Sequence, residues 1–232
     1  MKKTVYLFKC QGILDLQLVP NLYSTVKNIT GNECNRYCCI FRNTENGKFW
    51  SRSSTVKHME QNIPDYSAVA MSTVSKFVKL EMYCLPKGAK SWGLDKTNCG
   101  FYVDCLNDDI LHIYLVSSIE LTSNQILSLW GVFSKTYTAH YMVSFSLDSI
   151  KHVEIYMYGR CIYPALADPK TYYSKTEKDV VDKLYDLNHN QTCDLGSCFS
   201  SCIVTERVSI DERAYNSKRI VGNNTVLFTK SS

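Results

Sequence analysis

The sequence predicts an α+β fold, a single domain with an antiparallel β-sheet or sandwich core flanked by a few helices. Segments rich in β-branched and aromatic residues alternate with turn-forming pairs, which is typical of antiparallel strands. Only a few segments show the apolar spacing of a helix. No Pro/Gly/Ser-rich linker or internal repeat divides the 232 residues, so residues 1–232 are expected to form one domain.

The first elements follow from short apolar patterns. Val5–Phe8 and the alternating leucines of Leu14–Leu18 predict two strands. Residues 20–49 are polar and turn-rich, with a short strand expected at Cys38–Arg42. Asn46-Gly47 lies between two apolar pairs and predicts a hairpin turn.

The best helix candidate begins at Pro64 and extends to Cys84, since proline is favoured in a first turn. Apolar residues recur there at helical spacing on one face: Tyr66, Ala70, Val74, Phe77 and Val78. The alternative is a helix for a membrane or a partner, but the polar face carries few charges, which favours packing on the core.

The second half of the chain is expected to be mainly strands. They are Phe101–Cys105, Ile110–Ser117, Tyr137–Leu147, Val153–Tyr158 and a hairpin over Ile220–Thr229. The pairs Asp108-Asp109, Asp148-Ser149 and Asn223-Asn224 are expected as turns. Two more helices are predicted, Gln125–Phe133 with Ser123 as its cap, and Glu177–Leu187.

Composition excludes several classes of protein. The net charge of +4 is too small to make nucleic acid or an anionic membrane the defining partner. No apolar run is long enough for a transmembrane helix. Lys9 interrupts the first apolar run, so a secretory signal is not expected and the cytoplasm is the expected compartment.

Eleven cysteines are unusual for such a chain, and their odd number excludes a complete set of intramolecular disulfides. The two clusters are Cys34, Cys38 and Cys39, and Cys193, Cys198 and Cys202. Neither has the Cys-x-x-Cys spacing of a zinc knuckle. Buried thiols that pack as small apolar groups are favoured over disulfides, and both are favoured over a metal site.

No catalytic motif is present, and we expect no enzyme activity. The chain lacks a Gly-x-Ser-x-Gly elbow, a His-Glu-x-x-His pair and a glycine-rich phosphate loop. Chemistry at a clustered thiol is the remaining enzymatic alternative. Lys87, Lys90 and Trp92, in a basic segment over 85–98, could contact an anion or nucleotide, although a solvated loop is more usual. No metal or obligatory cofactor is expected.

Tyrosine is the other enriched residue, with sixteen in the chain. A group in the second half indicates either a sheet rich in aromatic residues or a contact surface, since tyrosine combines a large rigid ring with a polar tip. Its members are Tyr137, Tyr141, Tyr156, Tyr158, Tyr163, Tyr172 and Tyr173. Tyrosine ionises near pH 10 and free cysteine near 8.5, so at about pH 10.5 the net charge would fall to the order of −29. Densely packed chains would then repel one another.

Three stretches stand out in the C-terminal hundred residues: 138–147, whose His140-Tyr141 opens an aromatic strand, 148–159, which ends on Gly159, and Cys193-Asp194-Leu195. In these stretches the chain resembles the polyhedrins of cypoviruses, which crystallise inside infected insect cells. The high tyrosine content is a shared trait. Eleven cysteines exceed what is typical of the family, and residues 1–60 show no clear counterpart of its N-terminal arm and helix.

The resemblance implies a structural protein of viral occlusion bodies in the host-cell cytoplasm. Its subunits would form trimers and then a lattice that encloses virus particles and dissolves in an alkaline insect gut. Residues 1–60 lack a clear counterpart of the family's arm but are the candidate for an N-terminal arm and contact region. Family members can hold a nucleotide between subunits. The alternative from the residues alone is a soluble viral accessory module that binds a partner through a tyrosine-rich surface, without a lattice.

Overall fold

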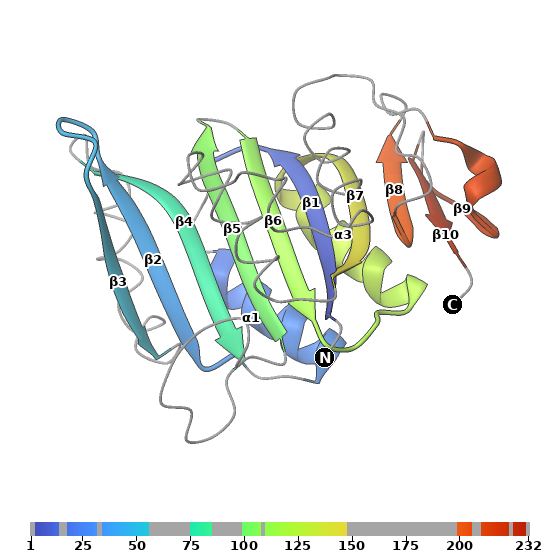
Figure 1. The fold of residues 1–232 in the computed structure, drawn as a ribbon, viewed down its shortest axis with the longest axis horizontal. Helices are drawn as coiled ribbons and strands as arrows, with labels where there is room; N and C mark the ends of the chain where they lie inside the picture. The colour runs from blue at the N-terminus through green and yellow to red at the C-terminus, as the bar shows by residue number, and fades with distance from the viewer. Residues whose placement is uncertain are drawn as a thin grey trace. The chain divides into compact units, whose positions relative to one another are not determined.

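The computed structural model describes residues 3–13, 18–31, 34–55, 75–84, 99–107, 110–147, 199–205, 210–222 and 225–230. The chain forms two compact units, Met1–Lys9 with Thr122–Ser232, and Cys10–Leu121. We call them the outer-segment unit and the central-segment unit. Strands and helices together give an antiparallel α+β fold, as the sequence predicts (Figure 1).

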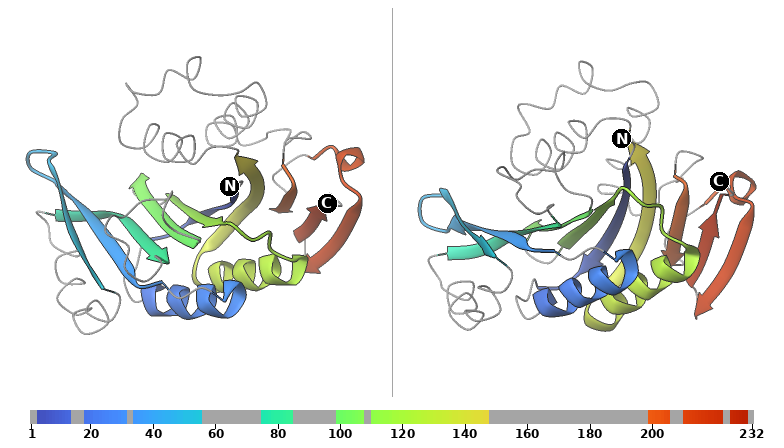
Figure 2. Two further views of the ribbon diagram at one scale, coloured as in Figure 1. Left: turned by 60° about the horizontal axis from the view of Figure 1, so that its bottom comes forward. Right: turned by 90° about the horizontal axis from the view of Figure 1, so that it is seen from below.

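The central-segment unit contains α1 (Leu18–Thr30) and the strands β2 (Arg36–Asn43), β3 (Phe49–Thr55), β4 (Ser75–Cys84), β5 (Cys99–Asn107) and β6 (Ile110–Ser117). Its strand order is β3-β2-β4-β5-β6, and each of these neighbours is antiparallel. The helix α1 lies on one face of these strands (Figure 2). Leu22 and Val26, one helical turn apart, are fully buried and anchor it there.

The outer-segment unit contains most of β1 (Lys3–Gln11), together with α3 (Ser123–Thr136), β7 (Thr138–Leu147), β8 (Ser201–Thr205), β9 (Ser217–Gly222), β10 (Thr225–Thr229) and the short 3-10 helix Glu212–Ala214. The strand order is β1-β7-β8-β10-β9. Thr4 contacts Ser146, and the Lys9 ammonium lies 5.9 Å from the Tyr141 ring, so β1 and β7 run in opposite directions.

Helix α3 shows why its residues form a helix at that place. Its cap is Thr122, one residue before the cap expected from the sequence, and Thr122 and Gln125 form a reciprocal capping box. Buried residues follow at helical spacing: Ile126, Leu129, Trp130 and Phe133. The Phe133 ring packs 4.8 Å from the ring of Phe8 on β1, so this face of α3 completes the core of the unit.

The helix predicted over residues 64–84 is wrong in its second half, where the structure has β4. Leu80, Met82 and Cys84 are buried at alternate positions, which is the period of a strand. The segment pairs with β2 on one side and β5 on the other. Ladders on both sides outweigh a helical pattern that depended on few apolar residues. The first half, 64–74, lies outside the described residues.

The turn-rich interpretation of residues 20–49 is wrong at its start, where α1 occupies Leu18–Thr30. Leu18 therefore begins a helix and does not end a strand, while residues 14–17 lie outside the described part. Gly31 follows at φ +69°, and its N–H donates to the Lys27 carbonyl, so the helix ends on a left-handed residue that favours glycine.

Most of the other predicted elements are confirmed. Strands β1, β2, β5 and β6 cover the predicted segments, and β6 has the predicted bounds. Strand β7 begins at Thr138, one residue after the predicted start, because Tyr137 caps the end of α3. The hairpin at Asn46-Gly47 joins β2 and β3: Gly47 has φ +70°, and the Asn43 carboxamide accepts the N–H groups of Glu45 and Asn46. The antiparallel pair β9–β10 confirms the hairpin over 220–229. The turns at 108–109, 148–149 and 223–224, the strand 153–158 and the helix 177–187 lie outside the described residues.

A buried pair of hydroxyls joins β7 to β8. Ser144 and Ser201 are 2% and 5% exposed, their Oγ atoms lie 2.6 Å apart, and the Ser201 N–H donates to Ser144 Oγ at 2.9 Å. These contacts satisfy a backbone donor that would otherwise be buried without a partner.

We expect Ser144→Ala to lower the free energy of unfolding by about 1–3 kcal/mol, because it leaves the Ser201 N–H and hydroxyl buried without this acceptor. Urea unfolding followed by circular dichroism measures the loss. The matched control is Ser128→Ala on the exposed face of α3, which should change stability by less than about 0.5 kcal/mol. Equal losses in the two variants would contradict the role of the buried pair.

Candidate functional site

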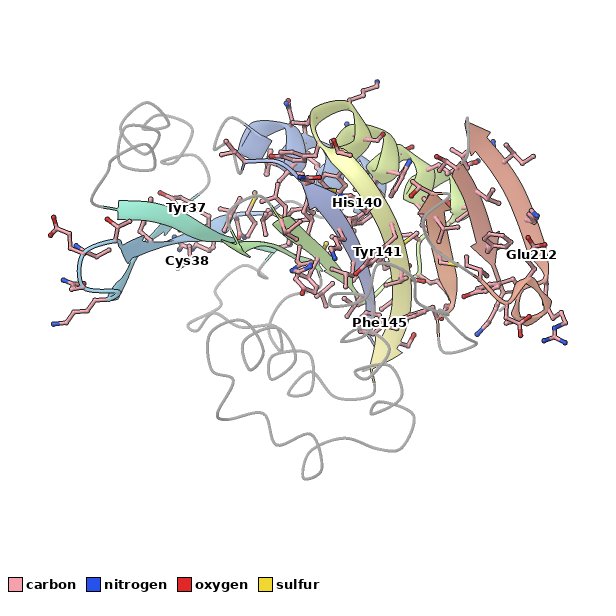
Figure 3. The ribbon with its side chains drawn as sticks, turned by 90° about the horizontal axis from the view of Figure 1, so that it is seen from above. Tyr37, Cys38, His140, Tyr141, Phe145 and Glu212 are labelled. Atoms are coloured by element: carbon pink, nitrogen blue, oxygen red, sulfur yellow. The ribbon has the colours of Figure 1, made fainter. Side chains whose placement is uncertain are left out.

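Two of the tyrosines expected at a contact surface lie in the core. Tyr137 and Tyr141 are 8% and 2% exposed, which corrects the prediction that they present rings to a partner. The cause is the position of β7, which has β1 and β8 as neighbours and packs against α3. Tyr141 and Phe145 project from β7 in Figure 3. Tyr156, Tyr158, Tyr163, Tyr172 and Tyr173 lie outside the described residues.

Tyrosine is a core residue elsewhere in the described chain as well. Four further side chains are 9% exposed or less: Tyr6, Tyr37, Tyr114 and Tyr215. The ring of Tyr215 lies 5.6 Å from that of Phe228, and the Lys230 ammonium is 5.5 Å from the Tyr215 ring. The tyrosine content therefore serves packing in these places, which the count alone could not distinguish from a contact surface.

The cysteines of the predicted disulfide clusters are thiols in the described structure. Cys34, Cys39 and Cys202 are buried and Cys38 is half-buried, and none of these four is in a disulfide. Cys193 and Cys198 lie outside the described residues. The arrangement agrees with the expectation of thiols that pack as small apolar groups.

A cluster of three thiols lies in the central-segment unit, and the sequence did not predict it. We call Cys34, Cys84 and Cys99 the thiol cluster; the three side chains are 2%, 5% and 0% exposed. Cys84 ends β4, Cys99 begins β5, and their Cα atoms are direct partners in the antiparallel ladder. The Cys84 thiol is hydrogen-bonded to both Cys34 and Cys99.

The sequence contains a pattern that indicates this cluster, but the pattern conflicts with the helix predicted over 64–84. Cys84 and Cys99 stand at the two ends of residues 85–98. A strand ending at Cys84 and a neighbour starting at Cys99 would place the two residues opposite each other, whereas a helix over 64–84 would not.

Several buried thiols have shifted pKa values. Burial raises the pKa of Cys10 and of Cys202 from 9.0 to about 12. Burial, with the neighbouring Cys38, also raises the pKa of Cys39. For Cys84 the hydrogen bond to Cys34 contributes most to raising the pKa, and burial adds to it. If these four thiols stay protonated, the net charge at about pH 10.5 is about −25, less negative than the composition suggested.

Strand β9 is an exposed edge. Among the described residues it pairs only with β10, and every side chain from Ser217 to Ile220 is exposed. Ile220 is 76% exposed, one of three large apolar side chains that are exposed in the described residues. Unpaired strand edges are templates on which another strand can pair.

The charges beside this edge are already engaged within the chain. The Lys218 ammonium contacts the Glu212 carboxylate at 2.7 Å, and the Arg219 guanidinium donates to the Asn124 carboxamide oxygen at 3.0 Å. Figure 3 shows Glu212 at the end of the unit that carries β9. These contacts hold both cations against their own chain. Cations held in this way oppose the pairing of another strand with β9 less than two unengaged cations would.

The predicted contacts to an anion or nucleotide fall outside the part of the chain that the structure describes. Lys87, Lys90 and Trp92 lie outside the described residues, as does the rest of 85–98. Within the described ranges, no group of three or more His, Cys, Asp and Glu side chains could hold a metal ion. No helix in the described part of the chain is long and apolar enough to cross a membrane.

Comparisons with known proteins add no relative: no protein-family model, curated protein or solved structure matches the chain.

Proposed function

We propose that this chain is a structural protein that self-assembles into the matrix of a viral occlusion body, a dense lattice in the host-cell cytoplasm that encloses virus particles. The observation that carries self-assembly is the exposed edge strand β9. The resemblance of residues 138–195 to cypovirus polyhedrins supports an occlusion-body lattice as the assembly that the chain forms. The proposal includes no catalytic step and needs no cofactor.

The occupant that fits β9 is a strand from a second copy of the chain. A pairing strand would use the backbone N–H and C=O groups that point away from β10, and it would cover part of Ile220. In an antiparallel pairing of two β9 strands centred between Arg219 and Ile220, each Arg219 lies opposite an isoleucine. The register therefore avoids placing like charges opposite each other.

A second edge allows the assembly to extend. Among the described residues β3 pairs only with β2, so its other side is also an edge. Pairing of β9 with β9 gives a closed dimer, whereas pairing of β9 with β3 of the next copy is head-to-tail and either closes into a ring, such as the expected trimer, or continues without limit. A lattice requires contacts of the second kind or additional surfaces.

The buried thiols support dissolution at alkaline pH. In the unfolded chain Cys10 and Cys202 ionise near pH 9.0, whereas in the folded chain they stay neutral until about pH 12. The unfolded state therefore binds fewer protons between these values, and folding stability falls as the pH rises from about 9. Ionisation of the buried tyrosine hydroxyls would act in the same direction, because a buried charge is costly.

The test is the pH dependence of solubility in cells that express the full chain. We expect particles that pellet at pH 7 and dissolve at about pH 10.5, where solvent-accessible tyrosines and thiols are ionised. A parallel lysis with a reductant determines whether disulfides between chains contribute. A freely soluble monomer at pH 7 would contradict the proposal and favour the alternative, a soluble accessory module that binds a partner protein.

A further inference from the structure

The thiol cluster differs from the other buried cysteines because one member, Cys84, contacts both of the others. Cys10 and Cys202 have no partner thiol among the contacts that shift their pKa values, whereas Cys84 is hydrogen-bonded to two thiols. A cysteine that only fills space needs no second thiol beside it. A thiol in contact with two other thiols is instead the starting arrangement for forming and exchanging a disulfide.

The backbone register selects one pair in the cluster. Cys84 and Cys99 are direct partners across β4 and β5. Opposed residues of antiparallel strands have Cα atoms about 4.5–5.5 Å apart, which lies within the range that a disulfide spans.

We propose that Cys34, Cys84 and Cys99 form a redox site in which a peroxide oxidises Cys84 and Cys99 to a disulfide, with Cys34 as a third thiol that can exchange with it. This inference does not rest on the proposed assembly function. The bond would join the ends of residues 85–98 covalently.

The oxidation balances with hydrogen peroxide as the oxidant. One thiol of the pair gives up its proton as its sulfur attacks a peroxide oxygen, the O–O bond breaks, and the sulfur becomes a sulfenic acid while hydroxide leaves and takes up that proton as water. The second sulfur then attacks the first, the S–O bond breaks, and the hydroxyl leaves with the second proton as another water molecule. Two thiols are oxidised by two electrons in total, and one peroxide is reduced to two waters.

Cys34 allows the site to form a second disulfide by exchange. Its sulfur contacts Cys84, so its thiolate can attack the Cys84 sulfur, form a Cys34–Cys84 disulfide and release Cys99 as a thiolate. No oxidant is consumed in this step, since one disulfide replaces another. An external dithiol returns either form to three thiols, with oxidation of the dithiol.

The experiment is a disulfide map of the full chain after treatment with graded hydrogen peroxide. Unreacted thiols are alkylated in denaturant, and the protein is cut with trypsin and chymotrypsin without reduction. Lysines at 87, 90 and 96 separate Cys84 from Cys99, and cleavage after Phe101 separates Cys99 from Cys105. The peptides of Cys84 and Cys99 therefore stay together only if a disulfide joins them.

We expect the linked Cys84–Cys99 peptide to form first and to disappear on treatment with dithiothreitol. Cys10 and Cys202 should remain fully alkylated at the same peroxide concentration and serve as internal controls. A map in which Cys84 and Cys99 stay alkylated while other cysteines pair would overturn the proposal. So would oxidation of all buried cysteines together, because that would indicate unfolding and not a local site.

Variants separate the pair from its third member. In Cys99→Ala the disulfide should move to Cys34–Cys84, and in Cys34→Ala the Cys84–Cys99 bond should form but no longer exchange. Cys202→Ala, which removes a buried thiol in the outer-segment unit, is the matched control and should leave the Cys84–Cys99 bond unchanged.

The Cys84–Cys99 disulfide, which closes residues 85–98 into a loop, should also raise the melting temperature of the native chain by roughly 5–10 °C. Because the native map alone decides whether the bond forms, a variant that fails to fold does not remove the test.

Discussion

Ile220→Lys is expected to leave the protein in the supernatant at pH 7 under conditions where the native chain pellets. The change removes the most exposed apolar side chain of β9 and adds a third cation beside Lys218 and Arg219. In the antiparallel pairing of two β9 strands centred between positions 219 and 220, the new lysine lies opposite Arg219 of the second strand. Like charges directly opposite each other are destabilising. We expect the soluble fraction to rise at least about tenfold, which corresponds to about 1.4 kcal/mol at the interface.

The control for this variant is another exposed isoleucine away from any strand edge. Ile13 is 79% exposed and follows β1, so Ile13→Lys adds the same charge and removes a similar apolar surface. It should leave the sedimentation of the protein unchanged. If both variants dissolve the particles equally, net charge controls assembly, and the proposed pairing of copies through β9 would be contradicted.

Phe133→Ala is expected to lower the free energy of unfolding by about 3–5 kcal/mol. The ring is fully buried and packs 4.8 Å from Phe8, so truncation leaves a cavity between α3 and β1. Total stabilities of domains are about 5–15 kcal/mol, so the loss would be a large fraction of what holds the outer-segment unit together.

Urea unfolding followed by far-ultraviolet circular dichroism measures this loss. Lys135→Ala lies two residues further along α3 on its exposed side, and it should change stability by less than about 0.5 kcal/mol. A loss below about 1 kcal/mol in Phe133→Ala would mean that α3 does not pack on β1 as described.

The sequence could predict elements whose local pattern and tertiary environment agree. The run at 110–117 is rich in β-branched and aromatic residues, and it forms a strand with the predicted bounds because both local preference and pairing favour that conformation. Asn46-Gly47 gave the hairpin because the turn requires a left-handed backbone at Gly47. The amphipathic period of α3 gave the helix and its buried face, with an error of one residue at the cap.

The errors arose where a distant pairing partner decided the outcome. Residues 75–84 carry apolar side chains that fit a helix period, yet strands on both sides fix them as β4. No local property of that segment reveals its neighbours. The thiol cluster was missed for the same reason, because Cys84 and Cys99 meet only when the register of β4 and β5 is known. Tyr141 was assigned to a surface because composition does not show which strands are central.

The division of the chain into units has a consequence for the order of events during synthesis. The central-segment unit is continuous from Cys10 to Leu121, so all of it can leave the ribosome and fold while later residues are still being added. The outer-segment unit combines Met1–Lys9 with residues after Thr122, so it can be completed only after the second half of the chain has been made. Among the described strands β9 follows all the others except β10 in chain order, so the edge proposed to join one copy to the next is made after the residues of those other strands. Neighbouring nascent chains on one messenger RNA therefore cannot pair through this edge until each has made the residues of the other described strands and of β9 itself.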